Sequence, residues 1–127
     1  MNPNQLNGAN LAYIGDAYYE LAIRKYLLTK NITNQKELHK QAINYVSAKS
    51  HHQIIEEFVQ NLDEKELEIF KRGRNYKYRS HKNISRNEYL SSSGLEALIG
   101  YLYLSENCLR LNKVIEKIIT LIEGKHE

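Results

Sequence analysis

The sequence predicts an all-α protein, and three observations support this. Apolar residues recur every three or four positions along most of the chain, which is the spacing of amphipathic helices. No stretch alternates convincingly between apolar and polar residues, as a half-buried strand would. A single proline and six glycines leave few of the turns that a β protein needs. Because 127 residues suffice for one domain with a modest core, we expect a single helical domain over residues 1–127.

Three helices are predicted in the first half of the chain. The first starts at Asn2-Pro3, a helix-start signal, and its apolar pattern continues from Leu6 to Leu28. The pattern stops at TKNITNQ, where Asn34 and Glu37 form a candidate capping box for a short second helix. The segment SAKSHHQIIEEFVQNL predicts the third helix, with one apolar side made of Ile54, Ile55, Phe58, Val59 and Leu62.

The second half predicts further helices separated by one loop. Asp63 with Glu66 is a second candidate capping box, and it opens a helix that carries Leu67 and Phe70. The segment GRNYKYRSHKN, residues 73–83, has no periodicity and is predicted to be a loop; Ser85 with Glu88 is a third candidate capping box. SSSGLEALIGYLYL, residues 91–104, predicts a helix capped by one of its serines. The last helix has apolar positions between residues 111 and 122, with Gly124 just past its end.

Positive charge is concentrated in one segment. The net charge is only +3, yet no acidic residue lies between Glu68 and Glu88, where seven basic residues occur: Lys71, Arg72, Arg74, Lys77, Arg79, Lys82 and Arg86. The rest of the chain has 11 basic and 15 acidic residues, a net charge of −4. This asymmetry indicates a surface that faces a polyanion.

Neither terminus nor any internal segment predicts export or a membrane. MNPNQLNGAN lacks the charged and apolar regions of a signal peptide, and no apolar run approaches the ~20 residues of a membrane span. Cys108 is the only cysteine, so the chain has no disulfide framework. We therefore expect a cytoplasmic protein.

Two acidic residues stand inside otherwise apolar helices. Asp16 lies between Gly15 and Ala17, and Glu96 precedes Ala97 in a segment that also contains Gly94 and Gly100. Because interior glycine costs a helix roughly 0.5–1 kcal/mol relative to alanine, several glycines beside an acid suggest that two helices cross closely there. The two carboxylates would then converge and repel each other unless one is protonated or a cation lies between them, and a divalent ion such as Mg²⁺ is the simplest resolution.

Each acid could instead have a purely structural role, and the spacing alone favours that role over metal binding. Asp16 could occupy the solvated edge of its helix, and Glu96 could be a first-turn acid favoured by the helix dipole. The basic segment, however, favours metal binding over a structural role. A carboxylate-bound metal beside a cationic surface is what phosphodiester hydrolysis requires, since the metal activates water and Lys or Arg side chains hold phosphates.

LNGANLAYIGDA, VSAKS, KRGRN and SSSGLEALIGYLYL occur in this order and resemble motifs of the ribonuclease III family. The match is with its short bacterial branch, Mini-ribonuclease III, which has the catalytic domain alone, and it spans essentially the whole chain. The resemblance implies that Asp16 and Glu96 are the catalytic residues that hold Mg²⁺. Larger relatives have further acids where this chain has Ala12 and Ser93, as the short branch does, which leaves the number of metal ions open.

The resemblance also implies a homodimer that cleaves double-stranded RNA to leave 5′-phosphate and 3′-hydroxyl ends. The short branch trims precursors of large-subunit (23S) ribosomal RNA, and whether a ribosomal protein presents that substrate stays open. No double-stranded-RNA-binding domain is expected within residues 1–127, so the catalytic domain itself must contact the duplex. The candidate RNA contacts are Arg72, Arg74, Lys77 and Arg79, with Lys49 as an additional candidate.

Two alternative functions for the same residues stay open at this point. The chain could be a non-catalytic dimer that binds double-stranded RNA with the same fold, or a helical adaptor whose basic loop binds an acidic protein. His51 and His52 are expected to be surface or half-buried residues, because neighbouring helix positions point about 100° apart and do not readily share a metal. By analogy with the family, Tyr13 is expected at the dimer seam.

Overall fold

The computed structural model describes residues 1–76 and 85–126, and within them it contains helices and no strand. The elements are η1 (Pro3–Gln5), α1 (Gly8–Thr29), α2 (Gln35–Val46), α3 (Ala48–Val59), α4 (Glu64–Arg74), α5 (Arg86–Leu104) and α6 (Cys108–Lys125). The all-α prediction is therefore confirmed. No helix in the described ranges is both long and apolar enough to cross a membrane.

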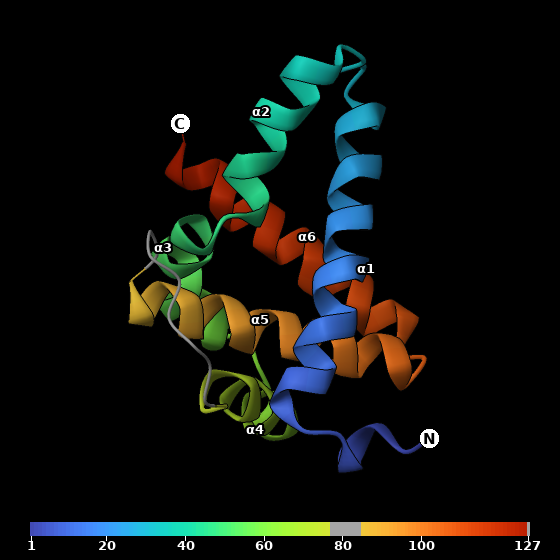
Figure 1. Ribbon diagram of the computed structural model, residues 1–127, viewed down its shortest axis with the longest axis vertical. Coiled ribbons are helices and arrows are strands. Elements are labelled where there is room, and N and C mark those ends of the chain that lie inside the picture. Colours follow the sequence, from blue (N-terminus) through green and yellow to red (C-terminus); the bar gives the residue numbers. More distant parts are fainter. Residues whose placement is uncertain (77–84, 127) are drawn as a thin grey trace.

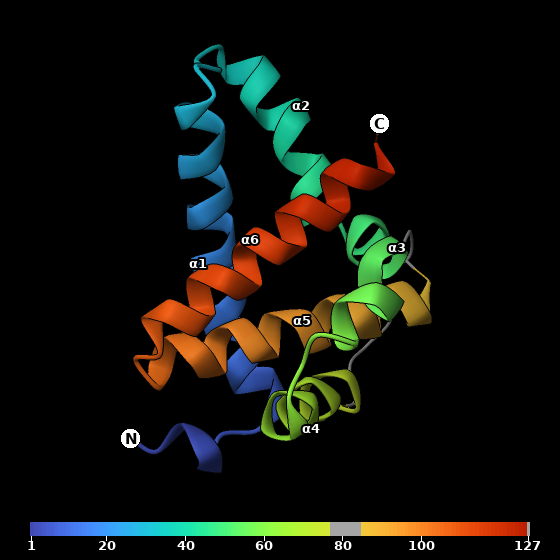
Figure 2. The same cartoon turned by 180° about the vertical axis from the view of Figure 1, so that it is seen from behind.

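Helix α5 is the centre of the fold. It crosses α1 and also packs against α3, α4 and α6 (Figures 1 and 2). Its middle is consequently enclosed on nearly all sides, and every residue from Ser91 to Gly100 except Glu96 is buried. The largest enclosed side chains come from several helices and meet around α5: Leu11, Tyr19 and Ile23 of α1, Phe58 of α3, Phe70 of α4 and Ile118 of α6.

Helix α1 extends beyond this core and forms a hairpin with α2 (Figure 1). Asn31 ends α1 in a left-handed conformation, with φ of 63°. The carboxylate of Glu123 in α6 holds both arms of the hairpin. Its Oε2 accepts hydrogen bonds from Tyr26 Oη at 2.6 Å and Tyr45 Oη at 2.8 Å, and Lys30 Nζ lies 2.9 Å away. One carboxylate thus joins α1, α2 and α6.

Several predicted helix ends are wrong by a few residues. Asn2 caps only the 3-10 turn, whereas Asn7 caps α1 by accepting a hydrogen bond from the backbone N–H of Asn10. α5 is capped by Ser85 rather than by a serine of residues 91–93, so it begins before the predicted segment. Gly124 lies inside α6 rather than beyond it, and residues 73–74 of the predicted loop belong to α4.

The capping boxes are confirmed at two of the three predicted positions. Asp63 with Glu66, and Ser85 with Glu88, make both reciprocal hydrogen bonds. Asn34 caps α2 through the backbone N–H of Glu37, but the Glu37 side chain accepts instead from Gln41 Nε2 at 2.8 Å. A glutamine one turn ahead therefore competes for this carboxylate.

Candidate active site at the crossing of α1 and α5

The two predicted acids are brought together where α1 crosses α5. Gly15 packs directly against the main-chain carbonyl of Glu96, and Gly100 packs against the main-chain carbonyl of Leu11. A Cβ atom at either glycine would overlap the opposing carbonyl oxygen, so only glycine permits this approach. The predicted close crossing is confirmed for Gly15 and Gly100. Gly94 serves a different contact, because it packs against Phe70 of α4.

The carboxyl groups of Asp16 and Glu96 lie within hydrogen-bonding reach of each other. Asp16 is exposed on α1, as the structural alternative for this residue requires, and Glu96 is half-buried. Glu96 is not a first-turn acid, since α5 begins ten residues earlier at Arg86. The structural alternative for Glu96, a first-turn acid favoured by the helix dipole, is therefore excluded, and the dipole does not account for a mid-helix acid that faces a second acid.

Burial and negative neighbours make ionisation of Glu96 unfavourable. Burial, the hydrogen bond with Asp16 and the negative charges of Asp16 and Glu20 raise the pKa of Glu96 to about 10. In the metal-free protein, Glu96 therefore keeps its proton at neutral pH and shares a hydrogen bond with Asp16. A divalent cation that displaces this proton would restore the negative charge of Glu96 and find oxygen donors on two sides.

The candidate metal ligands at this crossing are two carboxylates, those of Asp16 and Glu96. Within residues 1–76 and 85–126, no group of three or more His, Cys, Asp or Glu side chains is placed to hold a metal ion. Ala12 and Ser93, which stand where the larger relatives have further acids, are buried small residues and add no carboxylate. Two carboxylate oxygens fit Mg²⁺, which commonly binds with one or two protein carboxylates and keeps several water ligands.

A buried polar layer lies beside the carboxylate pair, and sequence reasoning missed it. His51 is 0% exposed, contrary to the expectation of a surface or half-buried histidine. Burial lowers its pKa to about 4, despite the backbone hydrogen bond of Tyr45 and the charge of Asp16, which act in the opposite direction. The serines of α5, at residues 91–93, are also buried. The only signal in the sequence was the SHH triplet within an otherwise apolar helix pattern.

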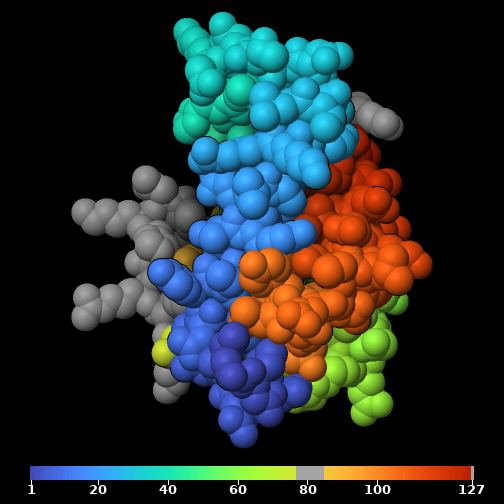
Figure 3. All heavy atoms as spheres, turned by 90° about the vertical axis from the view of Figure 1, so that its right-hand side faces the viewer, coloured from blue at the N-terminus to red at the C-terminus, as the bar shows by residue number. Residues whose placement is uncertain are grey.

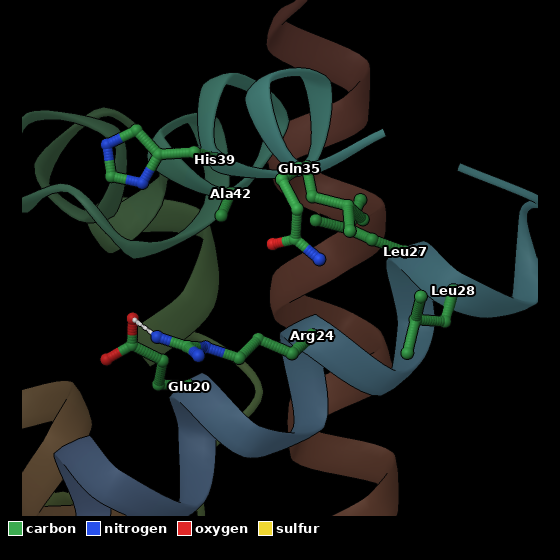
Figure 4. A pocket seen from close by; sticks show the side chains of 8 residues that line it. Glu20, Arg24, Leu27, Leu28, Gln35, His39 and Ala42 are labelled. Atoms are coloured by element: carbon green, nitrogen blue, oxygen red, sulfur yellow. Dashed lines mark hydrogen bonds and ion pairs between the residues drawn. The ribbon is translucent and has the colours of Figure 1, made fainter. Parts of the chain in front are cut away.

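A pocket of about 290 Å³ opens between α1 and α2 (Figure 4). Leu27, Leu28 and Arg24 line it from α1, and Gln35, Leu38, His39 and Ala42 line it from α2. Glu20 forms the end of the pocket and pairs with Arg24 at 3.3 Å. The negative charge of Glu20 also helps to raise the pKa of Glu96, but neither Asp16 nor Glu96 lines this pocket.

The structure distinguishes the predicted RNA contacts from one another. Arg72 is half-buried, and its guanidinium donates to the carbonyls of Asn4 at 2.9 Å and Leu6 at 3.1 Å and pairs with Glu68 at 3.0 Å. Arg74 lies over the ring of Phe70, with Cζ 6.0 Å from the ring centre. Lys49 is exposed at the start of α3. Lys77 and Arg79 lie outside the described residues.

An apolar stripe is exposed along α1. Tyr13 is 83% exposed, Leu21 65% and Leu28 54%, and Ala17 lies between the first two on the same helix face. Much of α1 is open to solvent beside the end of α5 and the start of α6, as the space-filling view shows (Figure 3). Three large apolar side chains on one helix face are unusual for a surface that meets only water.

Known proteins match the chain over most of its length. A family model, the Ribonuclease III domain, matches residues 9–107. A Mini-ribonuclease 3 from Clostridium tetani is 44% identical, over 94% of this chain and 80% of that protein. Mini-ribonuclease 3 from Streptococcus pneumoniae is 41% identical, over 95% of this chain and 97% of the relative.

A solved structure has the same fold. The crystal structure of a Fusobacterium nucleatum protein superposes with a TM-score of 0.81 at 34% identity, and the match covers 91% of this chain and 93% of the other. The relatives of this family are endoribonucleases that leave 5′-phosphate and 3′-hydroxyl ends. The chain therefore belongs to the ribonuclease III family of endoribonucleases, and within it to the Mini-ribonuclease 3 group.

Proposed function

We propose that this protein is a Mg²⁺-dependent endoribonuclease that cleaves double-stranded RNA in the cytoplasm and matures the ends of precursor large-subunit (23S) ribosomal RNA. Asp16 and Glu96 are its metal ligands and catalytic residues. The observation that carries the proposal is the contact between these two carboxyl groups at the glycine-lined crossing of α1 and α5. A purely structural role gives no reason to place two acids against each other, since only a shared proton or a cation makes their contact favourable.

The chemistry follows from the position of the pair. Asp16 and Glu96 would hold Mg²⁺ there, and the ion would supply an activated water for attack on phosphorus and a positive charge near the departing oxygen. Asp16 is exposed and can be reached by an RNA backbone, whereas the half-buried Glu96 is held in place by the packed middle of α5. Asp16 and Glu96 would hold the ion, and two carboxylates would suffice because Mg²⁺ commonly keeps several water ligands.

The substrate is held by charge and shape. Two of the predicted RNA contacts, Arg74 and Lys49, lie in the described residues and have charged groups that bind no backbone carbonyl. Lys77 and Arg79 stay predictions from the sequence. Phosphate contacts of this kind suit A-form RNA, whose deep major groove hides the base edges. The exposed stripe of Tyr13, Leu21 and Leu28 supports a homodimer, because a second copy would cover it.

Cleavage of a perfect RNA duplex with and without Mg²⁺ tests the proposal. Asp16→Asn and Glu96→Gln keep the size of each side chain and remove its charge, and each should abolish cleavage while duplex binding persists. Glu116→Gln is the matched control, because Glu116 is an exposed acid of α6 away from the crossing. If Asp16→Asn and Glu96→Gln cleave as fast as this control, the assigned site is wrong.

The same assay separates the rival function. A wild-type protein that binds duplex but does not cleave it in Mg²⁺ would be a non-catalytic RNA-binding dimer. Sedimentation of the wild type and of Tyr13→Arg tests the assembly, and the variant should shift the population from dimer to monomer, since an arginine replaces the most exposed large apolar side chain of the stripe.

A further inference from the structure

His51 connects the helices that carry the two carboxylates. It lies in the first turn of α3, fully enclosed, and both ring nitrogens are hydrogen-bonded. Nε2 is 2.8 Å from the carbonyl oxygen of Tyr45, and Nδ1 is 2.8 Å from Oγ of Ser92. The ring also packs edge-to-face on Tyr19, with ring centres 5.3 Å apart. A single side chain therefore contacts α1, the end of α2 and α5.

The hydrogen-bond directions in this cluster are fixed. A carbonyl can only accept, so Nε2 of His51 carries the hydrogen that is donated to Tyr45 O. Nδ1 then has a free lone pair and accepts from the hydroxyl of Ser92. The same carbonyl accepts a hydrogen bond from Tyr19 Oη at 2.6 Å, so both of its lone pairs are used. The observed orientation of the imidazole satisfies every partner, whereas a ring flipped by 180° would place carbon atoms against Tyr45 O and Ser92 Oγ.

The contacts of His51 fall one helical turn from each acid. Tyr19 follows Asp16 by three residues on α1, and Ser92 precedes Glu96 by four residues on α5. Residues at these spacings share a helix face, so the cluster lies directly beside the carboxylate pair. We propose that His51 is a positioning residue for the proposed metal site, which through Ser92 and Tyr19 sets how the segments carrying Glu96 and Asp16 face each other.

The contact at Gly15 and Gly100 does not by itself determine how the segments carrying Asp16 and Glu96 face each other. Gly15 and Gly100 fix how close α1 and α5 come, since a carbonyl lies against each of them. Ile14 packs beside Gly100 and adds an apolar contact, but apolar contacts have no preferred direction. Directional hydrogen bonds in a buried site add that restraint, and loss of such supporting contacts typically weakens metal binding or activity about 10–100-fold.

Neighbouring residues provide a matched comparison. His52 contacts Ser91 through Nδ1 at 2.9 Å, a histidine–serine contact between the same two helices as that of His51 with Ser92. His52 is exposed, and Ser91 is five residues before Glu96, on a different helix face. Ser92→Ala and Ser91→Ala thus remove equivalent hydroxyl groups, but only the first removes a hydrogen bond of the proposed positioning cluster.

The test measures Mg²⁺ affinity by calorimetry on the full-length protein, together with kcat and KM for a perfect RNA duplex. We expect Ser92→Ala and His51→Leu to weaken Mg²⁺ binding and lower kcat about tenfold, with KM changed less than about twofold. His51→Gln should restore most of the wild-type values, because its amide can donate to Tyr45 O and accept from Ser92. Ser91→Ala should match the wild type.

A merely structural role predicts a different pattern. Tyr26→Phe removes a partly buried hydrogen bond to Glu123, far along α1 from the carboxylates, and serves as a control for loss of stability. If Tyr26→Phe weakens Mg²⁺ binding as much as Ser92→Ala does, or if folded Ser92→Ala binds Mg²⁺ like the wild type, the inference is overturned. It rests on the proposed function, which fails separately if wild-type protein binds no Mg²⁺ or if Asp16→Asn and Glu96→Gln still cleave.

Discussion

Gly15 packs against the main-chain carbonyl of Glu96, so the helices that carry the two acids touch backbone to backbone. This relationship places the Asp16 side chain, one residue later on α1, beside the Glu96 side chain. The approach depends on a missing Cβ atom, which gives the contact a clear mutational test.

Gly15→Ala is expected to lower the free energy of unfolding by about 2–3 kcal/mol or more, since the added methyl group must displace a main-chain carbonyl. Gly124→Ala is the control, because nothing lies within 4 Å of a Cβ atom at that position. Alanine there should leave stability unchanged or raise it by up to about 1 kcal/mol. Urea unfolding curves measure both, and equal midpoints for the two variants would contradict the close crossing.

Glu96→Gln is expected to fold at least as stably as the wild type in the absence of divalent cations. The amide can still hydrogen-bond to Asp16, and the variant cannot place a second negative charge beside it. Mg²⁺ should raise the melting temperature of the wild type and leave that of the variant unchanged. A variant that is markedly less stable without metal, and gains stability with it, would assign Glu96 to the core rather than to the metal site.

Unfolding should depend on pH through His51. Its pKa is about 4 when folded, against an ordinary value of 6.5, so between these values the unfolded chain binds a proton that the folded chain does not. Stability should therefore fall as the pH is lowered from 6.5 towards 4, by up to about 3 kcal/mol for this residue. The groups that face the imidazole are Tyr19 and Asp16 of α1, the Tyr45 carbonyl of α2 and Ser92 of α5.

Comparison with His51→Gln isolates this contribution, since glutamine has no proton to gain in that range. The difference in unfolding free energy between wild type and variant should narrow as the pH is lowered from 6.5 to 4. Parallel stability curves over this range would show that His51 is not held neutral in the folded protein.

Arg110→Ala is expected to cost about 2–3 kcal/mol of stability. Glu66 is 5% exposed, and its carboxylate is bound by Arg110 through Nε at 2.6 Å and Nη2 at 2.9 Å, so the variant leaves a buried charge with one partner fewer. Arg24→Ala, which breaks the exposed pair with Glu20, should change stability by less than about 1 kcal/mol. Thermal unfolding at neutral pH compares the two variants, and similar losses would show that burial of Glu66 is unimportant.

Arg72 and Arg74 should respond differently to neutralisation. Arg74→Gln is expected to weaken duplex binding and reduce the slope of log K against log salt concentration by about one, as for one lost phosphate contact. Arg72→Gln should mainly destabilise the fold, because its guanidinium holds the carbonyls of Asn4 and Leu6. Filter binding at several salt concentrations measures the slopes, and an unchanged slope for Arg74→Gln would remove it from the RNA interface.

The sequence predicted the fold class and most helices because helical periodicity and capping boxes are local signals. It predicted the crossing of α1 and α5 because glycine inside an apolar helix is unfavourable unless another backbone packs against it, and Gly15 and Gly100 behave as expected. It misplaced the start of α5, since Ser91–Ser93 are as good N-caps in composition as Ser85, and only burial distinguishes them.

Tertiary contacts determine the features that local sequence signals do not encode. His51 is polar and sits beside another histidine, so its enclosure follows only from the arrival of Ser92, 41 residues later, and of the Tyr45 carbonyl. In the sequence nothing distinguishes Arg72 from the other cations of the basic segment, and only its contact with the N-terminal residues gives it a structural role. The predicted proximity of Asp16 and Glu96 is confirmed. Binding of a metal ion and of RNA at these residues stays a prediction, which the experiments above test.

The 80 residues that separate Asp16 from Glu96 also determine when the site can form. α1 is synthesised first, but its partner is α5, so the crossing requires closure of a loop that contains α2, α3 and α4. Contacts of such long sequence separation form late and slow the folding of a domain. A ribosome-bound chain that ends before α5 therefore exposes Asp16 without Glu96, and the proposed site can form only once nearly the whole domain has been made.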